Sequence, residues 1–210
     1  MCIRDSKRAG LAVPDSVMLI VSPGCCGRNT SVLSSMRAYQ DRFYYLLMDE
    51  TDIVTGRHLK KIPKAVAEIC EGLKKKPSVV MICITCVDAL LGTDMERVCH
   101  KAEEYAGVPV RPCYMYALTR EGRKPPMVHV RQSVYSLLEP KKKKGNVVNL
   151  LGYFSPLTDD CELYDLLHGA GVKTIHEISR CKDYAQYQTM SEANFNLVLH
   201  LSLIHILTLP

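Results

Sequence analysis

The sequence of 210 residues lacks any run of the roughly 18 to 20 apolar residues that a membrane-spanning helix needs, so we expect no membrane protein. It also lacks a strong charge of one sign. The 27 Lys and Arg residues against 22 Asp and Glu residues give +5, too little to indicate a nucleic-acid binder. No Gly-x-x-x-x-Gly-Lys-Ser/Thr or Gly-x-Gly-x-x-Gly motif occurs, so nucleotide binding has no motif to support it.

Cysteine, in contrast, is plentiful, with ten residues in the chain. We identify no secretory leader, and without one such cysteines are expected to be reduced thiols. Metal binding or catalysis then becomes a better explanation than disulfides. The sequence therefore predicts a cytoplasmic protein whose thiols carry its chemistry.

Both ends of the chain match translations of one inverted DNA sequence. Met-Cys-Ile-Arg-Asp at the start is encoded by ATGTGTATAAGAGAC. With AG added at its 3′ end, this sequence has a reverse complement that encodes Leu-Ser-Leu-Ile-His. The same five residues occur near the C-terminus. We expect residues 1–6 and 201–210 to be adapter-derived sequence, and the chain to be a fragment of a longer gene product.

Apolar runs and amphipathic segments alternate through residues 7–140. Runs typical of buried strands cover residues 16–21, 43–48, 79–84 and 108–114. Apolar residues at helical spacing cover residues 59–75, and a second helix is expected up to residue 106, with Thr93 as N-cap and Glu96 completing a capping box. This order predicts an α/β fold, a Rossmann-like parallel sheet flanked by helices.

A lysine-rich linker is predicted at residues 141–145, where four like charges resist burial. Beyond it, residues 146–200 contain expected strands at 147–151, 172–175 and 195–199 and a helix at 159–169. We interpret this part as the start of a second, truncated α/β unit.

Two groups of cysteines follow predicted strands. Cys25 and Cys26 come directly after the first, and Cys83 and Cys86 form a Cys-x-x-Cys at the end of the third. Ligands of parallel sheets bind beyond the carboxyl ends of strands, so these thiols could hold a soft metal or an iron–sulfur cluster.

The individual cysteines differ as candidates. Cys86 is the better ligand, because Cys83 lies inside an apolar strand and is expected in the core. Of the adjacent Cys25 and Cys26, one is expected to bind and the other to pack. A thioredoxin-like site is disfavoured because its motif opens a helix, and a zinc site because a second close pair is missing. The remaining cysteines are expected to be ordinary core or surface residues: Cys70, Cys99, Cys113, Cys161 and Cys181.

Four segments resemble component 1 of nitrogenase and the nitrogenase-like oxidoreductases. Ser22-Pro-Gly-Cys25 is similar to the family's G-x-x-G-C loop, and Thr51-Asp-Ile-Val-Thr-Gly56 to its KDIVFGG segment. Thr85-Cys-Val-Asp-Ala-Leu-Leu-Gly-Thr-Asp94 is similar to its E/T-C-x-x-x-x-I-G-D-D motif, and Asn194-Phe-Asn-Leu-Val198 to its LNLV strand. The order and spacing of these segments hold over almost the whole chain.

The resemblance implies an iron–sulfur cluster, [4Fe-4S] or P-cluster-like, shared with a homologous component 1 subunit. Cys25 and Cys86 match two of the three cysteines that each subunit contributes, and Cys26 is a possible further ligand. Gly24 would let the backbone approach the cluster closely. The third family cysteine and the residues of a second metallocluster fall outside the matching part of the chain, and no catalytic residue is assigned.

The resemblance leaves three functions open. The first is an oxidoreductase subunit that receives electrons from an ATP-dependent iron–sulfur reductase for substrate reduction. The second is a non-catalytic scaffold on which a metallocluster is assembled, which the family also contains. The third is a Rossmann-like binding protein without a cluster, whose cysteines are merely buried.

Overall fold

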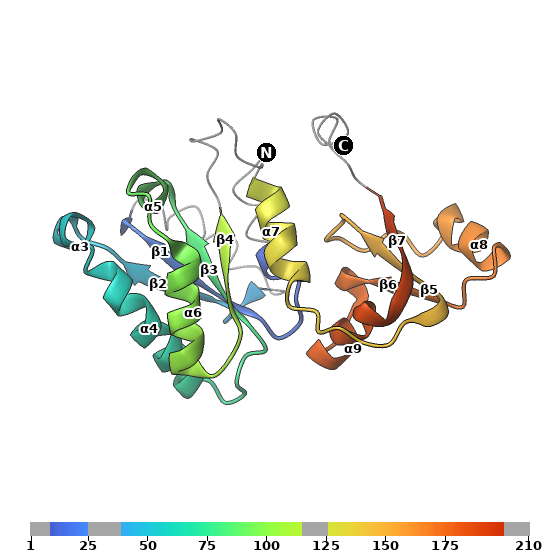
Figure 1. Ribbon diagram of the computed structural model, residues 1–210, viewed down its shortest axis with the longest axis horizontal. Helices are drawn as coiled ribbons and strands as arrows, with labels where there is room; N and C mark the ends of the chain where they lie inside the picture. The colour runs from blue at the N-terminus through green and yellow to red at the C-terminus, as the bar shows by residue number, and fades with distance from the viewer. Residues whose placement is uncertain (1–8, 25–38, 115–125, 200–210) are drawn as a thin grey trace. The chain divides into compact units, whose positions relative to one another are not determined.

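A computed structural model describes residues 9–24, 39–114 and 126–199 of the chain. It divides into two compact units, the first ending at Leu137 and the second beginning at Leu138, with Ala12–Pro14 grouped with the second (Figure 1). The adapter-derived ends predicted at residues 1–6 and 201–210 lie outside the described residues and remain a prediction. No helix in the described ranges is long and apolar enough to cross a membrane.

The first unit contains a sheet of four parallel strands. They are β1 (Val17–Ser22), β2 (Phe43–Leu47), β3 (Val80–Ile84) and β4 (Val110–Tyr114), in the order β2-β1-β3-β4. Every residue of β1 is buried, as its uninterrupted apolar sequence predicts for a strand covered on both faces. The predicted α/β fold with a parallel sheet is confirmed.

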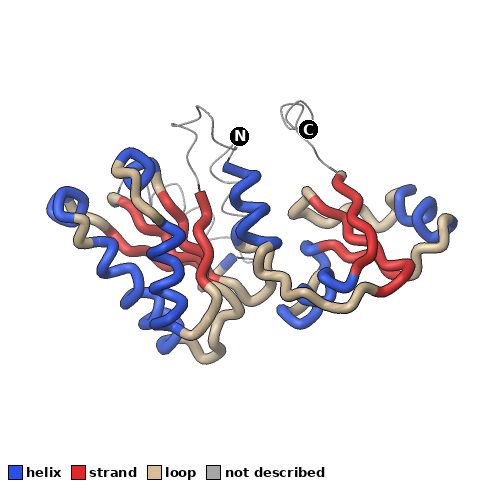
Figure 2. Tube along the Cα trace, in the orientation of Figure 1, coloured by secondary structure: helices blue, strands red, loops and turns tan. Residues whose placement is uncertain are grey.

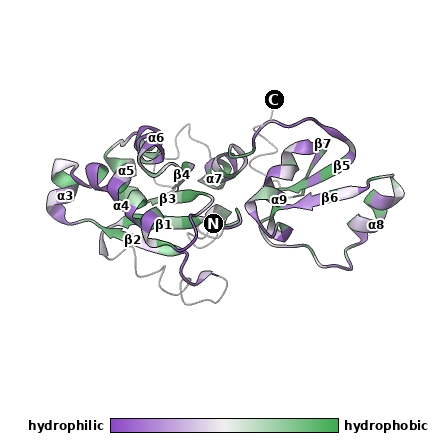
Figure 3. Ribbon diagram, turned by 90° about the horizontal axis from the view of Figure 1, so that it is seen from below, coloured by the Kyte–Doolittle hydropathy of each residue, from purple (hydrophilic) through white to green (hydrophobic). Residues whose placement is uncertain are grey.

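Five helices lie entirely within the described residues of this unit: α3 (Glu50–Thr55), α4 (His58–Gly72), α5 (Cys86–Leu90), α6 (Met95–Ala106) and α7 (Pro126–Tyr135). The long helices α4 and α6 pack against each other and against one face of the sheet (Figures 1 and 2). Ile62 and Val66 of α4 and Ala102 of α6 are fully buried there. Figure 3 shows hydrophilic residues on these helices, whereas the strands that they cover are mostly hydrophobic.

The start of α6 differs from the expected capping box. The helix begins at Met95, and the carboxylate of Asp94 caps it by accepting a hydrogen bond of 3.1 Å from the Arg97 amide. Glu96 lies only two residues after this cap, too close to complete a box. The hydroxyl of Thr93 instead lies 3.4 Å from Asp88 Oδ1, so the predicted pairing of Thr93 with Glu96 is wrong.

The second unit contains three parallel strands, β5 (Lys144–Leu151), β6 (Thr174–Glu177) and β7 (Ala193–Val198), in the order β6-β5-β7. Two helices, α8 (Glu162–Gly169) and α9 (Tyr184–Gln188), and two short 3₁₀ turns, η2 (Ile178–Arg180) and η3 (Thr189–Glu192), connect them. No residue of α8 is buried, and Leu166 and Phe195 stay largely exposed.

Strand β5 starts inside the segment that the sequence predicted as a linker. Lys144 falls within the predicted linker of residues 141–145, but it is the first residue of β5. Its ammonium pairs with Glu192 of η3, and Lys143 Nζ donates to the Ser191 carbonyl at 2.9 Å. The lysines therefore reach partners without being buried, which allows the strand to start earlier than charge alone suggested.

We predict that Gly10→Ala lowers the free energy of unfolding by about 1 to 2 kcal/mol. A Cβ at this buried position would lie 2.7 Å from Met18 Cε and 3.1 Å from Cys113 Sγ, so packed side chains would have to move. Gly72→Ala is the control, because nothing lies within 4 Å of its added Cβ at the end of α4. This variant should be neutral or more stable by about 0.5 kcal/mol in urea unfolding. Equal effects of the two substitutions would contradict the packing described here.

Candidate functional site

The carboxyl ends of β1 and β3 meet at one edge of the sheet. The two strands are parallel neighbours, and Val21 lies opposite Ile84 in the register. Ser22 therefore ends β1 beside Thr85, the residue that follows β3. Gly24 comes two residues later on the first segment, and Cys86 one residue later on the second, as the first residue of α5. Cys25 and Cys26 lie outside the described residues, so their placement stays a prediction.

The two cysteines of the Cys-x-x-Cys have different surroundings. Cys83 lies within β3, opposite Ile20 of β1 and Cys113 of β4, and its exposed fraction is 0%. The expectation that it is a core residue is confirmed. Cys86 is half-buried and stands beyond the strand, which ends at Ile84. Of this pair, only Cys86 is accessible to a ligand.

Other cysteines are poorly suited to bind metal. Cys70, Cys99 and Cys113 are buried. Burial raises the pKa of the Cys99 thiol strongly, and it raises the pKa of the half-buried Cys181 thiol to about 11. Because the thiolate is the form that binds metal, these side chains behave as neutral packing groups.

Gly24 is exposed, and a Cβ built on it would meet nothing within 4 Å. The described surroundings of this residue therefore leave room for a neighbouring group, as a close approach to a cofactor requires. They do not by themselves demand glycine.

Two hydroxyl groups at this edge are buried without a hydrogen-bond partner. Ser22 Oγ and Thr85 Oγ1 are both inaccessible, and neither has a partner among the described residues. Buried polar atoms are normally satisfied, so hydroxyls without a partner among the described residues are unusual at this edge. Hydroxyl donors beside a thiol suit an iron–sulfur cluster, whose sulfur atoms accept hydrogen bonds.

Within the described ranges, no group of three or more His, Cys, Asp or Glu side chains is arranged to hold a metal ion. The described residues thus offer one accessible thiol at the sheet edge, Cys86, together with the two hydroxyls. This partial set fits one side of a cluster whose other ligands come from elsewhere, and it does not fit a self-contained metal site.

A buried histidine–aspartate pair involves Asp88, which follows Cys86 by two residues in α5. His58, the first residue of α4, and Asp88 of α5 both have side chains that are 1% exposed, and His58 Nε2 lies 3.0 Å from Asp88 Oδ1. The other ring nitrogen, Nδ1, lies 2.9 Å from the Asp52 carbonyl oxygen. A carbonyl can only accept, so Nδ1 carries a proton and a single further proton lies between Nε2 and Oδ1. The pair is therefore neutral as a whole and can be buried without a net charge.

Asp52 of α3 anchors the same region through its carboxylate. Lys61 Nζ lies 2.6 Å from Oδ2 and Arg57 Nε lies 2.8 Å from Oδ1, while the carboxylate itself is almost fully buried. The hydrogen bonds from Lys61 and Arg57 lower the pKa of Asp52 to about 2. Asp49 caps α3 by accepting from the Asp52 amide at 2.6 Å.

Asp52 and Asp88 both lie in motifs that the sequence analysis identifies, but the motifs do not predict the contacts of these residues. Asp52 lies in the segment Thr51–Gly56, and Asp88 lies two residues after Cys86. The histidine that joins them is 30 positions away from Asp88 in the chain. A histidine at the start of an amphipathic helix gives no local signal that it is buried.

Large apolar side chains are exposed on elements that surround the sheet edge. Leu47 ends β2, Val54 belongs to α3, Leu90 ends α5 and Leu91 follows it. Their exposed fractions range from 51% to 85%. Exposed apolar residues concentrated around one edge favour contact with another protein there.

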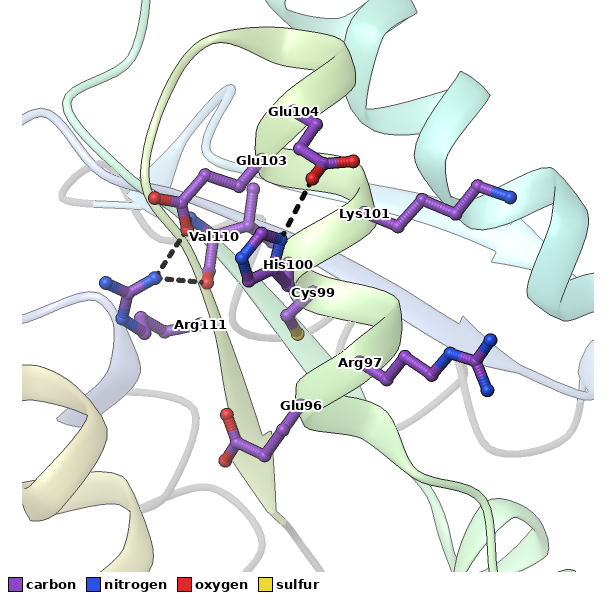
Figure 4. Close-up of a pocket in the computed structure, with 9 residues that line it drawn as sticks. All are labelled: Glu96, Arg97, Cys99, His100, Lys101, Glu103, Glu104, Val110 and Arg111. Carbon is purple, nitrogen blue, oxygen red and sulfur yellow. Dashed lines mark hydrogen bonds and ion pairs between the residues drawn. The ribbon is translucent and has the colours of Figure 1, made fainter.

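A separate hollow of about 710 Å³ lies along α6 and the start of β4 (Figure 4). Two pairs of its charged side chains are in contact: Arg111 Nη1 lies 2.6 Å from Glu103 Oε2, and His100 Nδ1 lies 3.4 Å from Glu104 Oε1. Cys99, which also borders it, is almost fully buried. The hollow contains none of the predicted ligands, and its paired charges point to a solvated helix face.

The family model of the nitrogenase component 1 type oxidoreductases matches residues 5–207 of the chain. Among curated proteins, the chain is similar to the "Nitrogenase iron-molybdenum cofactor biosynthesis protein NifE" of Rhizobium meliloti, at 28% identity over 180 residues. This match covers 82% of the chain and 37% of that protein. The chain is 27% identical to the protein of the same name from Klebsiella pneumoniae, covering 90% of the chain and 44% of that protein. The chain thus spans about two fifths of the length of these relatives.

Among solved structures, the chain is similar to "Nitrogenase Cp1 at pH 6.5", with a TM-score of 0.63. The match covers 91% of the chain and 40% of the solved chain, at 22% sequence identity. At this identity the likeness concerns the fold, and it agrees with the parallel sheets flanked by helices.

We predict that Asp52 makes the protein sensitive to acid. Its folded-state pKa is depressed, so its contribution to stability is complete above the ordinary aspartate pKa of about 4 and is lost as the pH falls towards about 2. Asp52→Asn should therefore be less stable than the wild type near neutral pH, with a difference that shrinks across this window. Urea unfolding at a series of pH values measures it.

Lys61→Gln tests the cause of this behaviour. Removing the ammonium raises the folded-state pKa of Asp52 towards its unfolded value. The acid-induced loss of stability should therefore start at the same pH as in the wild type but be smaller and be complete at a higher pH. An unchanged pH profile in both variants would contradict the role given to this carboxylate.

Proposed function

The chain belongs to the family of nitrogenase component 1 type oxidoreductases, and we propose that it holds one side of an iron–sulfur cluster shared with a second subunit. The observation that carries the proposal is the position of Cys86. Its half-buried thiol lies at the carboxyl edge of a parallel sheet, beside two buried hydroxyls that have no partner among the described residues.

In this proposal Cys86 and Cys25 bind the cluster as thiolates, with Cys26 as a possible third ligand and Gly24 leaving room beside them. Both segments follow neighbouring parallel strands and therefore leave the sheet at the same edge. The bound cluster would accept and pass on single electrons. The hydroxyls of Ser22 and Thr85 would donate hydrogen bonds to its sulfur atoms, which stabilises negative charge on them.

The remaining ligands would come from a homologous component 1 subunit, because the described residues supply only one accessible thiol at this edge. The exposed apolar residues around it, such as Leu90 and Leu91, support a protein contact there. A dry interface would also exclude water from the cluster. Such a centre requires reduced thiols, which agrees with a cytoplasmic protein.

Of the two family roles, we favour a scaffold for metallocluster assembly. The curated relatives named above are cofactor biosynthesis proteins, which supports this role for the present chain. The alternative is a subunit that receives electrons from an ATP-dependent reductase and reduces a substrate. Both roles are compatible with the shared cluster proposed here, so a functional experiment is needed to distinguish them.

We predict that Cys86→Ala abolishes cluster binding in the assembled pair of subunits, whereas Cys83→Ala does not. Iron and acid-labile sulfide are measured after anaerobic reconstitution. Cys83→Ala should retain the full complement and lose about 1 kcal/mol of stability, because it removes only a packed sulfur atom. If Cys86→Ala also retained its iron and sulfide, the proposed site would be wrong.

A transfer experiment separates the two roles. We predict that the loaded wild-type complex donates its cluster to an apo-acceptor protein when the two are mixed anaerobically without nucleotide. Electron paramagnetic resonance of the separated proteins follows the metal. A cluster that stays bound and is instead reduced by an ATP-dependent iron–sulfur reductase would favour the electron-transfer role.

A further inference from the structure

Among the side chains that the structure describes, few hold the helix that begins with Cys86 in place. α5 contains only five residues, far fewer than a helix needs to be stable in isolation. Leu90, near its end, is 72% exposed, and Leu91 beyond it is 51% exposed, so neither anchors the helix in the core. Val87 packs against the core only partly. The direction of the Cys86 thiol therefore depends on other contacts of α5.

Asp88 supplies the strongest of these contacts. Its side chain is 1% exposed, and Oδ1 lies 3.0 Å from His58 Nε2, within an ordinary hydrogen-bond distance. The Thr93 hydroxyl is farther from the same oxygen, at 3.4 Å, and the Thr93 amide donates to the Asp88 carbonyl at 3.1 Å. Oδ2 has no partner among the described residues. Without His58, a buried carboxyl group would be left with one weak hydrogen bond.

His58 is itself held firmly from the other side. Its Nδ1 proton is donated to the Asp52 carbonyl oxygen at 2.9 Å, and its ring is as buried as Asp88. Asp52 is fixed in turn by Lys61 and Arg57. The imidazole thus connects the start of α4 with α5, for which the described residues show few other anchors.

We propose that His58 is a positioning residue for Cys86, and that it acts through the hydrogen bond between its Nε2 atom and Asp88. The bond holds Asp88 inside the protein, and with it the first turn of α5, so that Cys86 stays half-buried at the sheet edge. The inference rests on the proposed function only where it concerns cluster binding. The orientation of the thiol can be measured without any metal.

Two substitutions of His58 distinguish the roles of its two ring nitrogens. The amide of Gln reaches the place of Nε2 and can still donate to Asp88, so His58→Gln keeps the proposed bond. The shorter Asn reaches only the place of Nδ1, so His58→Asn keeps the bond to Asp52 and loses the bond to Asp88. His100→Asn is the matched control, because His100 also faces a carboxylate, Glu104 at 3.4 Å, but on the exposed surface of α6.

The first readout is the rate at which iodoacetamide alkylates Cys86 in the folded, metal-free protein, followed by mass spectrometry of its peptide. Cys161, which is half-buried in the second unit, is the internal reference. We expect His58→Asn to raise the rate of Cys86 relative to Cys161 by about tenfold, because the unpaired carboxyl group favours local opening of α5. His58→Gln should stay within about twofold of the wild type, as should His100→Asn.

Three results would overturn the proposal: an unchanged Cys86 rate in His58→Asn, an equal increase in His58→Gln, or a parallel increase at Cys161. The last would show general unfolding in place of local release. The electron paramagnetic resonance spectrum of the reconstituted subunit pair provides the second readout, and it should change in His58→Asn and be restored in His58→Gln.

The two readouts keep this inference separate from the proposed function. If the wild-type pair takes up no iron, the cluster proposal fails, while the alkylation rates still decide the role of His58. If the cluster forms and neither its spectrum nor the alkylation rate responds to His58→Asn, the positioning role fails alone.

Discussion

Parallel pairing between β1 and β3 sets Ser22 beside Thr85 and makes the segments with Gly24 and Cys86 leave the sheet at the same edge. Antiparallel pairing would have placed these two loops at opposite ends of the strands. The strands can lie in the middle of a parallel sheet because both are continuous apolar runs, flanked by β2 on one side and β4 on the other. Backbone geometry alone thus brings the segments with Gly24 and Cys86 to one edge of the sheet.

The polar groups beneath this edge are arranged so that little net charge is buried. His58 and Asp88 share one proton between Nε2 and Oδ1, and the carboxylate of Asp52 is neutralised by two cations that reach it from partly exposed positions. Burying an isolated carboxylate would cost several kcal/mol, so each of these groups depends on its partner. Three elements that are distant in sequence, α3, α4 and α5, are thereby joined by hydrogen bonds at the site.

The sequence predicts the strands of the first unit well, because buried parallel strands are recorded directly as apolar runs such as residues 16–21. Helix α4 is equally visible in its spacing of apolar residues. The cap of α6 was misassigned because Thr93 and Asp94 are both good N-caps, and the contact of Thr93 with Asp88 decides between them. The His58–Asp88 pair could not be found, since it joins positions 30 residues apart and leaves no periodic signal. The resemblance to known motifs indicates the candidate ligands Cys25 and Cys86, which periodicity does not reveal.

Burial also decides which thiols of this cysteine-rich chain are available for chemistry. Cys83 and Cys113 lie opposite each other inside the sheet, and Cys99 lies between helix and sheet, where burial raises its thiol pKa and keeps it protonated. Cys86 escapes this only because β3 ends two residues before it and α5 carries it to the sheet edge. A site that offers one accessible thiol from the described residues needs other chains or segments to complete it. In the proposed function, shared coordination fits both family roles, so the choice between them rests on the cofactor biosynthesis relatives.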